Sequence, residues 1–245
     1  MSRRAKIIIP LAVFLVLCLA GGCLALLVFT GAIVPNSAAA SEYEILGVDI
    51  SSYQGSVDFA ELSEQGVLFA YIKATEGSSM VDRMFAENFE KAEQTDVRVG
   101  AYHFFSFDSA GSTQAENFIS TVEAADGMLP PAVDVELYGD YLSHPPEDTE
   151  KVKGELRVLL DALEEKYGMK PVIYATSKSY KLFIKGDFDR YDLWIRDVLH
   201  HPSVDGWVFW QYSNRGRLDG YDGKEKYIDL NVFYADAEKF ENYGK

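Results

Sequence analysis

The sequence predicts an α/β fold: a modified β/α barrel of about eight strands with a helix-poor last third, preceded by one N-terminal transmembrane helix. Three observations predict it. Short apolar runs alternate with amphipathic helical stretches from residue 45 onward. Polar residues end nearly every one of these runs. Before the alternation, residues 7–34 form an uncharged run that exceeds the roughly 20 residues needed to span a bilayer.

The chain of 245 residues divides into three parts. Residues 1–35 are predicted to be a cytoplasmic basic stub and a transmembrane signal-anchor, because Arg3, Arg4 and Lys6 precede the apolar run and a basic flank stays in the cytoplasm. The alternative is a secretory signal peptide cleaved near Ala40, although the apolar core of such peptides is usually shorter, about 7–15 residues. Residues 36–44 are predicted to be a linker. Residues 45–245 form the barrel domain, which we expect to be monomeric and extracytoplasmic, held at the cell membrane by a single span.

Charge and composition exclude several classes of function. After the first six residues the chain carries 20 basic and 38 acidic residues, a net charge of -18, so we expect no nucleic-acid partner. The two cysteines, Cys18 and Cys23, both lie in the apolar run, so the domain has no thiol chemistry. The sequence has no H-E-x-x-H, no Cys/His cluster and no glycine-rich phosphate loop. We therefore predict no metal and no cofactor.

The strands and helices can be assigned in order from the periodicity of apolar residues. The strongest helix covers residues 149–167, with Leu156, Leu160 and Leu163 on one stripe and Gly168 as its end. Three further helices are predicted at residues 57–65, 84–95 and 112–123. The predicted strands are residues 45–50, 67–74, 98–105, 129–136, 171–175, 193–196, 207–212 and 227–230. This βα alternation predicts a parallel sheet, closed as a barrel or open and doubly wound.

The stretch LPPAVDVE, residues 129–136, is the most informative. Side chains alternate across a strand, so Asp134 and Glu136 project from the same face. Each carboxylate raises the energy of ionising the other, so the pair points to acid–base chemistry or a metal site. The competing interpretation is a solvated strand end with two ordinary surface acids.

The rest of the chain favours the functional interpretation. In a parallel barrel all strand C-termini meet at one rim, where active sites form. Polar residues are predicted at that rim from nearly every strand: Asp49, Lys73, Glu76, Tyr102, His103, Asp134, Glu136, Tyr174, Arg196, Asp197, Gln211, Tyr212 and Asp229.

Eight segments, in this order, resemble the landmarks of glycoside hydrolase family 25, the lysozymes or N-acetylmuramidases. They are GVDISSYQG (47–55), FAYIKATEG (69–77), VGAYHFF (99–105), QAENF (114–118), LPPAVDVE (129–136), VIYA (172–175), FWQYS (209–213) and IDLNVF (228–233). The resemblance covers about residues 46–240. It implies a TIM-like barrel and hydrolysis of the β-1,4 bond from N-acetylmuramic acid to N-acetylglucosamine in the glycan strands of peptidoglycan.

The resemblance also implies roles for four acids. Glu136 matches the general acid and Asp134 the second essential carboxylate, while Asp49 and Asp229 match two further acids of the cleft. Two positions depart from the pattern. Arg196 and Asp197 stand where many members have an alanine and a nearby tyrosine, which leaves their function open, and Arg83 stands where a proline is common.

Three mechanistic routes stay open from the residues alone. Asp134 could serve as a nucleophile, assist inversion, or orient the substrate's own N-acetyl group, which the family implies. We predict substrate contacts from Tyr102, Tyr174, Gln211 and Tyr212, together with Lys73 and Glu76. We expect Lys73 to pair with Glu76 or with Asp49. His103 is predicted to be a hydrogen-bonded core residue. The rival functions are an inactive peptidoglycan-binding module of the same fold and a Mg²⁺-dependent phosphohydrolase, for which the rim offers few basic residues.

Overall fold

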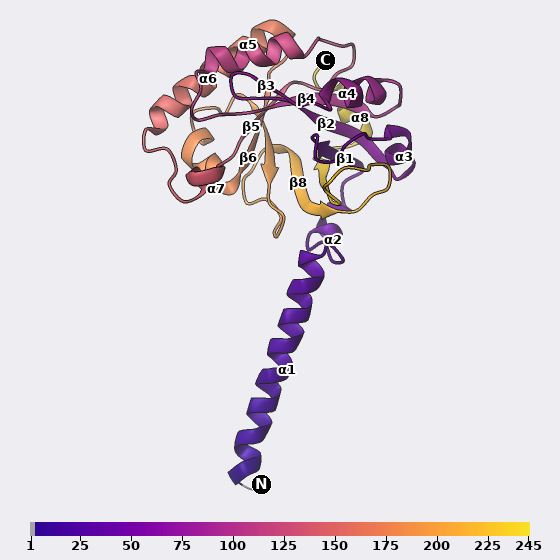
Figure 1. Cartoon of the computed structure of the whole chain (residues 1–245), viewed down its shortest axis with the longest axis vertical. Coiled ribbons are helices and arrows are strands. Elements are labelled where there is room, and N and C mark those ends of the chain that lie inside the picture. The colour runs from indigo at the N-terminus through magenta and orange to yellow at the C-terminus, as the bar shows by residue number, and fades with distance from the viewer. Residues whose placement is uncertain (1–2) are drawn as a thin grey trace.

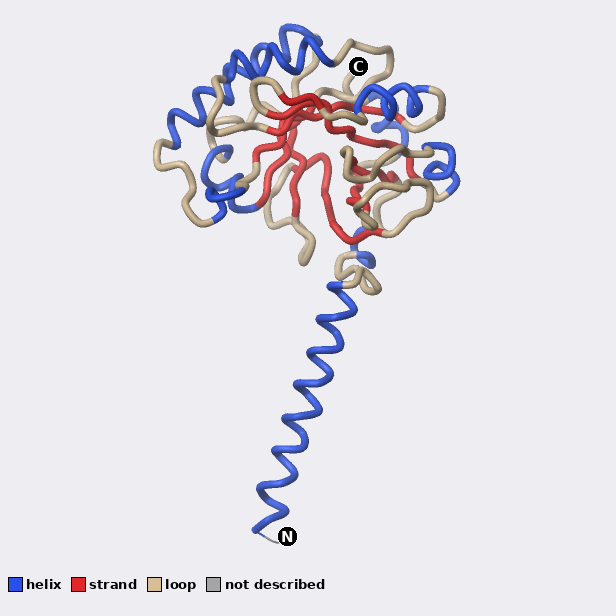
Figure 2. The backbone as a smooth tube through the Cα atoms, in the orientation of Figure 1, coloured by secondary structure: helices blue, strands red, loops and turns tan. Residues whose placement is uncertain are grey.

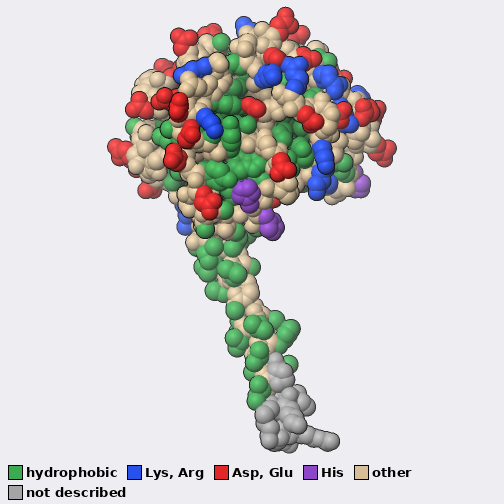
Figure 3. Space-filling view, turned by 180° about the vertical axis from the view of Figure 1, so that it is seen from behind, with side chains coloured by type: hydrophobic (Ala, Val, Ile, Leu, Met, Phe, Trp, Pro, Cys, Tyr) green, Lys and Arg blue, Asp and Glu red, His purple; other side chains and the backbone are tan. Residues whose placement is uncertain are grey.

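The computed structural model describes residues 3–245 and shows a long helix projecting from a barrel (Figure 1). The helix, α1, covers Arg3–Phe29, and its part Leu11–Phe29 is long and apolar enough to cross a membrane. Apolar side chains cover the part of this helix next to the barrel, whereas charged side chains are spread over the barrel (Figure 3). The first two residues of the predicted basic stub lie outside the described residues.

Eight strands close into a barrel, as predicted (Figure 2). Going round the barrel the order is β1, β2, β4, β5, β6, β7, β8, β9 and back to β1; β3 pairs only with β2. The bounds are β1 Ile45–Ile50, β2 Val67–Glu76, β3 Met80–Val81, β4 Arg98–Phe104, β5 Ala132–Val135, β6 Val172–Thr176, β7 Asp192–Arg196, β8 Trp207–Gly216 and β9 Ile228–Phe233.

The barrel is mixed, which corrects the expectation of a parallel sheet. The pairs from β1 through β8 are parallel, but β9 runs antiparallel to both β8 and β1. The physical reason is the short connection between β8 and β9, which returns the chain directly instead of through a crossover helix. Asp229 therefore lies near the start of its strand, and not at a C-terminal end as predicted.

Aromatic rings fill the end of the barrel at which the parallel strands begin. Tyr71 stacks on Trp194 with ring centroids 4.8 Å apart, and Phe69 contacts Phe209 at 5.2 Å. Glycine makes room for them: a Cβ at Gly100 would lie 2.5 Å from the Tyr71 ring. This packed floor leaves only the opposite end of the barrel open, where the parallel strands end.

Helices cover the outside of the barrel. The largest apolar core lies between these helices and the strands. They are α3 Phe59–Glu64, α4 Phe85–Glu93, α5 Gly111–Thr121, α6 Thr149–Tyr167, α7 Ser177–Ser179 and α8 Ala237–Asn242, with a 3₁₀ turn at Gly139–Leu142 and a π turn at Tyr180–Ile184. The predicted helix at residues 149–167 is confirmed at both ends, and Gly168 follows it with a φ of 67°. No described helix separates β7, β8 and β9, so the helix-poor last third is also confirmed.

Residues 36–44 do more than link the helix to the barrel. They include the short helix α2, Ser37–Ala40, and Ala40 is buried against Trp210, Tyr212 and Val232 on the outer face of β8 and β9. The segment that the sequence presents as a linker is therefore packed on the barrel.

Candidate active site

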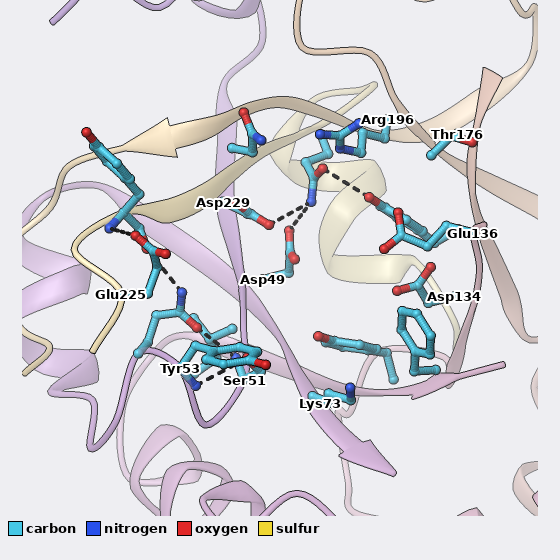
Figure 4. A pocket seen from close by; sticks show the side chains of 18 of the residues that line it. Asp49, Ser51, Tyr53, Lys73, Asp134, Glu136, Thr176, Arg196, Glu225 and Asp229 are labelled. Carbon is cyan, nitrogen blue, oxygen red and sulfur yellow. Dashed lines mark hydrogen bonds between the residues drawn. The ribbon is translucent and has the colours of Figure 1, made fainter. Parts of the chain in front are cut away.

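One cavity of about 1080 Å³ opens at the rim of the barrel, and it brings together the four predicted acids. Asp49, Asp134, Glu136 and Asp229 all line it, and their carboxyl groups face a common space (Figure 4). They come from strands far apart in the sequence. Asp49 lies on β1, Asp134 lies on β5, Glu136 directly follows β5, and Asp229 lies on β9.

Asp134 and Glu136 lie where the alternation of strand β5 predicts. Val133 and Val135, the residues of opposite parity, are fully buried in the core outside the barrel. This packing directs both acids to the inside. Asp134 is buried, and no hydrogen-bond partner for its buried Oδ1 atom exists among the described residues. A buried acceptor without a donor is costly, and this oxygen is therefore open to a donor from outside the chain.

Asp49 and Asp229 form a second pair across the β1–β9 ladder, where they are direct partners. The Asp49 Oδ2 atom accepts hydrogen bonds from Gln211 Nε2 and Asn231 Nδ2, both at 2.8 Å. Gln211 Nε2 also contacts Asp229 Oδ2 at 3.3 Å. In contrast to Asp134, Asp49 is thus held by two amide donors of the protein itself.

Burial is the largest influence on the pKa of all four acids, and it raises each one. The pKa of Asp134 lies well above its usual range through burial, with added repulsion from Glu136 and Asp49. Burial also raises the pKa of Glu136, against the opposing charges of Arg196 and Lys73. The pKa of Asp229 is raised strongly by burial and by Asp49. Burial raises the pKa of Asp49, whereas its hydrogen bonds lower it.

Two cations face this acidic cluster. Lys73 pairs with Glu76 at 2.7 Å, as predicted, and its ammonium lies 4.7 Å from the centre of the Phe104 ring. Glu76 itself lies outside the residues that line the cavity. Arg196, whose role the sequence leaves open, points into the cavity at the end of β7 (Figure 4).

The predicted aromatic contacts separate into two groups. Tyr102 and Tyr174 line the cavity, and the Tyr174 hydroxyl donates to Gln211 Oε1 at 3.1 Å. Tyr212 does not line it: its side chain packs on the outer face against Ala40 and Trp210. Since Gln211 faces the cavity and neighbours in a strand alternate, Tyr212 has to face the other way, and the expected substrate contact is wrong.

His103 is a buried core residue, as predicted. Its Nδ1 atom lies 2.7 Å from Thr75 Oγ1 and its Nε2 atom 3.0 Å from Gln114 Oε1. Burial lowers its pKa to about 4, so the ring is neutral at pH 7. Both ring nitrogens are occupied within the core, away from the cavity.

Sequence reasoning missed the residues that support the acids. Asn231 donates to Asp49, and the Trp194 ring nitrogen donates to Asn231 Oδ1 at 2.8 Å. One signal for Asn231 was present, because it follows Asp229 by two residues and so shares its face. Trp194 is both a core residue and part of this network.

Paired carboxyls with raised pKa values at the mouth of a barrel, with aromatic rings beside them, are typical of a glycoside hydrolase. The family model of glycosyl hydrolases family 25 matches residues 48–221. The chain belongs to this family and is a glycoside hydrolase of peptidoglycan.

Two solved structures and one further relative show the extent of the similarity. A family 25 glycosyl hydrolase from Bacillus anthracis is 54% identical, with a TM-score of 0.79 over 83% of this chain and 95% of its own. A bacterial lysozyme from Streptomyces coelicolor is 27% identical, with a TM-score of 0.73 over 82% of this chain and 96% of its own. The autolytic lysozyme of Clostridium acetobutylicum is 30% identical over 189 residues, which are 76% of this chain and 55% of that protein.

Proposed function

We propose that the protein is a muramidase that cleaves the β-1,4 bond between N-acetylmuramic acid and N-acetylglucosamine. Glu136 acts as general acid, and Asp134 assists by orienting the N-acetyl group of the sugar on which the bond breaks. The observation that carries this proposal is the buried Oδ1 atom of Asp134, which lacks a donor among the described residues. The N–H of a 2-acetamido group is a donor of the kind that this oxygen requires.

The reaction proceeds in two steps that conserve atoms and charge. Protonated Glu136 gives its proton to the glycosidic oxygen while the acetamido oxygen attacks C1, and the leaving sugar departs with a free hydroxyl. Asp134 accepts the hydrogen bond of the acetamido N–H and stabilises the positive charge that develops on the ring. Ionised Glu136 then takes a proton from a water molecule, which attacks C1 from the side that the leaving group left, while the bond between C1 and the acetamido oxygen breaks and the acetamido group is restored. The product retains its configuration.

The environment of Glu136 suits its role. Burial raises the pKa of Glu136, so a fraction of it remains protonated at a pH where an exposed glutamate would be ionised. Asp49 and Asp229 place two further carboxyl groups beside the reacting ring, and Gln211 holds both of them in place. Tyr102 and Tyr174 provide ring faces for the sugars.

We also propose that α1 remains attached and holds the barrel at the outer surface of the cell membrane. The length and apolar character of Leu11–Phe29 support this proposal, as does the packing of residues 36–44 on the barrel. The alternative of a released protein requires a cut near Ala40, which is buried in that contact.

An oligosaccharide that lacks the acetamido group tests the role of Asp134. We expect a substrate with a hydroxyl in place of the acetamido group at the cleaved muramic acid to react at least about 100-fold more slowly, because the internal nucleophile is missing. The measurement is the initial rate of reducing-end release, with binding of the analogue checked by competition. Cleavage of the bound analogue at a rate comparable to that of the natural substrate contradicts N-acetyl participation.

A further inference from the structure

The junction between α1 and the barrel consists of residues 36–44. One buried polar residue of this junction contacts two strands of the active site from outside the barrel. Asn36 is only 5% exposed, although its side chain is polar. Its Nδ2 atom donates to the carbonyl oxygen of Asp197 at 3.0 Å and to that of Tyr212 at 3.3 Å. These acceptors lie 161 and 176 residues further along the chain. Such long-range contacts from one amide show that the junction is a specific interface.

The two carbonyl groups belong to the residues that directly follow Arg196 and Gln211. Arg196 and Gln211 are partners in the parallel pairing of β7 with β8. Just beyond this pair, the Asp197 amide donates to the Gln211 carbonyl at 3.2 Å. Asn36 thus joins the end of β7 to the middle of β8 on the outer face, while the side chains of Arg196 and Gln211 point into the cavity.

Further contacts fix Asn36 in this position. Ala40, four residues later, is buried against Trp210 and Tyr212. The Trp210 ring nitrogen donates to the same Asp197 carbonyl at 2.9 Å. Tyr43 lies edge-on to Trp207 with centroids 5.4 Å apart, and its hydroxyl is 3.1 Å from His201 Nε2. The junction therefore covers the outside of β7 and β8 over several residues.

We propose that Asn36 is a positioning residue of the active site, which holds the end of β7 against the middle of β8 and so keeps Arg196 and Gln211 in register with the four acids. This inference rests on the proposed muramidase function. Gln211 contacts Asp49, Asp229 and Tyr174 at once, so a small shift of its strand misaligns several groups of the cavity. Displacements of this size reduce rates strongly even when they originate far from the reacting atoms.

A functional consequence follows for the anchor. A cut near Ala40 would remove Asn36 together with α1. The same segment that attaches the barrel to the membrane helix then also completes the active site. Release from the helix lowers activity, so full activity is confined to the anchored form.

Three variants of the full chain in detergent test the inference. Asn36→Leu keeps the branched shape and the number of non-hydrogen atoms of the side chain but removes both hydrogen bonds. Tyr167→Phe is the matched control, because its hydroxyl is a buried donor to the Val122 carbonyl at 2.8 Å and lies on α6, outside the cavity. Ser37→Ala is the local control, since Ser37 is the exposed neighbour of Asn36. The substrate is a soluble oligosaccharide of alternating N-acetylglucosamine and N-acetylmuramic acid, with Tm measured in parallel.

We expect kcat of Asn36→Leu to fall about tenfold or more, with KM within about twofold of the wild type. Both controls keep the wild-type kcat, although Tyr167→Phe loses a few degrees of Tm, much as Asn36→Leu does. If Asn36→Leu does not fold, Asn36→Ser replaces it, because serine is too short to reach both carbonyls. Its kcat is then compared with that of Tyr167→Phe in the same way.

Equal kcat values for Asn36→Leu and Tyr167→Phe would overturn the inference, because Asn36 would then be a stabilising residue only. If the wild type is active and the two variants have equal kcat values, the muramidase proposal still stands. A wild type that releases no reducing ends overturns the muramidase proposal itself, so the two failures can be told apart.

Discussion

Asp134 shows most clearly how one residue of the site can lower the stability of the fold. Its carboxyl group is buried, its Oδ1 atom lacks a partner among the described residues, and its pKa is raised well above the usual range by burial. Between the pKa of an unfolded aspartate and this raised value, the folded state binds more protons than the unfolded state. Stability conferred by the protonated group is therefore present at low pH and decreases as the pH rises through this window.

The first prediction is that Asp134→Asn stabilises the fold while it removes activity. At pH 7 we expect the free energy of unfolding to rise by at least about 1 kcal/mol, because the amide carries no charge to desolvate. The difference should disappear as the pH falls below about 3, where the wild-type carboxyl is protonated in both states. Denaturant unfolding at the two pH values measures it. A variant less stable than the wild type at pH 7 would contradict this account of the site.

The second prediction concerns Arg196, which lowers the pKa of Glu136 and of the neighbouring acids. Replacing it with glutamine removes a positive charge, so every carboxylate of the cavity becomes harder to ionise. Both limbs of the pH profile of kcat/KM should move to higher pH, by up to about one unit. Lys170→Gln, an exposed position before β6, is the control and should leave the profile unchanged. An unshifted or lowered profile for Arg196→Gln would show that Arg196 does not act on these acids.

At the residue scale, the sequence could reveal groups on one strand but not partners between strands. The spacing of Asp134 and Glu136 was sufficient to place them on one face. The contacts from Asn231 and Gln211 to Asp49 join residues 182 and 162 positions apart, and no local pattern encodes such pairs. The error at Tyr212 was avoidable, because alternation excludes it from the face that Gln211 occupies.

At the scale of elements, periodicity predicted strands and helices well, and strand direction poorly. The helix at residues 149–167 has a long apolar stripe and a glycine end, and both of its bounds are correct. The strand beginning at Ile228 shows the same apolar pattern whichever way it runs, so its antiparallel pairing depends on the short connection that precedes it. The four acids still meet, because reversing β9 brings its first residues to the same rim.

The third prediction tests the glycines that admit the aromatic floor of the barrel. In Gly100→Ala the new methyl group would meet the Tyr71 ring, so we expect the free energy of unfolding to fall by about 1–3 kcal/mol. Gly154→Ala is the matched control on α6, where nothing lies within 4 Å, and should raise it by about 0.5–1 kcal/mol. Chemical denaturation measures both. Equal stability of the two variants would mean that the floor of the barrel adapts to the extra methyl group.

On the scale of the whole molecule, the barrel and α1 meet through a packed junction at α2 (Figure 1). The sequence identified the apolar run and its length, but the junction depends on contacts between Ala40 and strands more than 160 residues away.

The fourth prediction is that the protein extracted from membranes keeps residues 1–40. Intact-mass measurement checks it, and a mature chain beginning near residue 41 would favour the signal-peptide alternative.

The muramidase reaction with Glu136 as general acid is the central claim, and the products of digestion test it most directly. Purified peptidoglycan is digested with the full chain, reduced with borohydride and analysed by mass spectrometry, with Glu136→Gln as the control. We predict fragments whose reduced ends are derived from N-acetylmuramic acid, formed by the wild type and lost by at least about 1,000-fold in rate in the variant. Fragments ending in reduced N-acetylglucosamine, or equal digestion by Glu136→Gln, would contradict the claim.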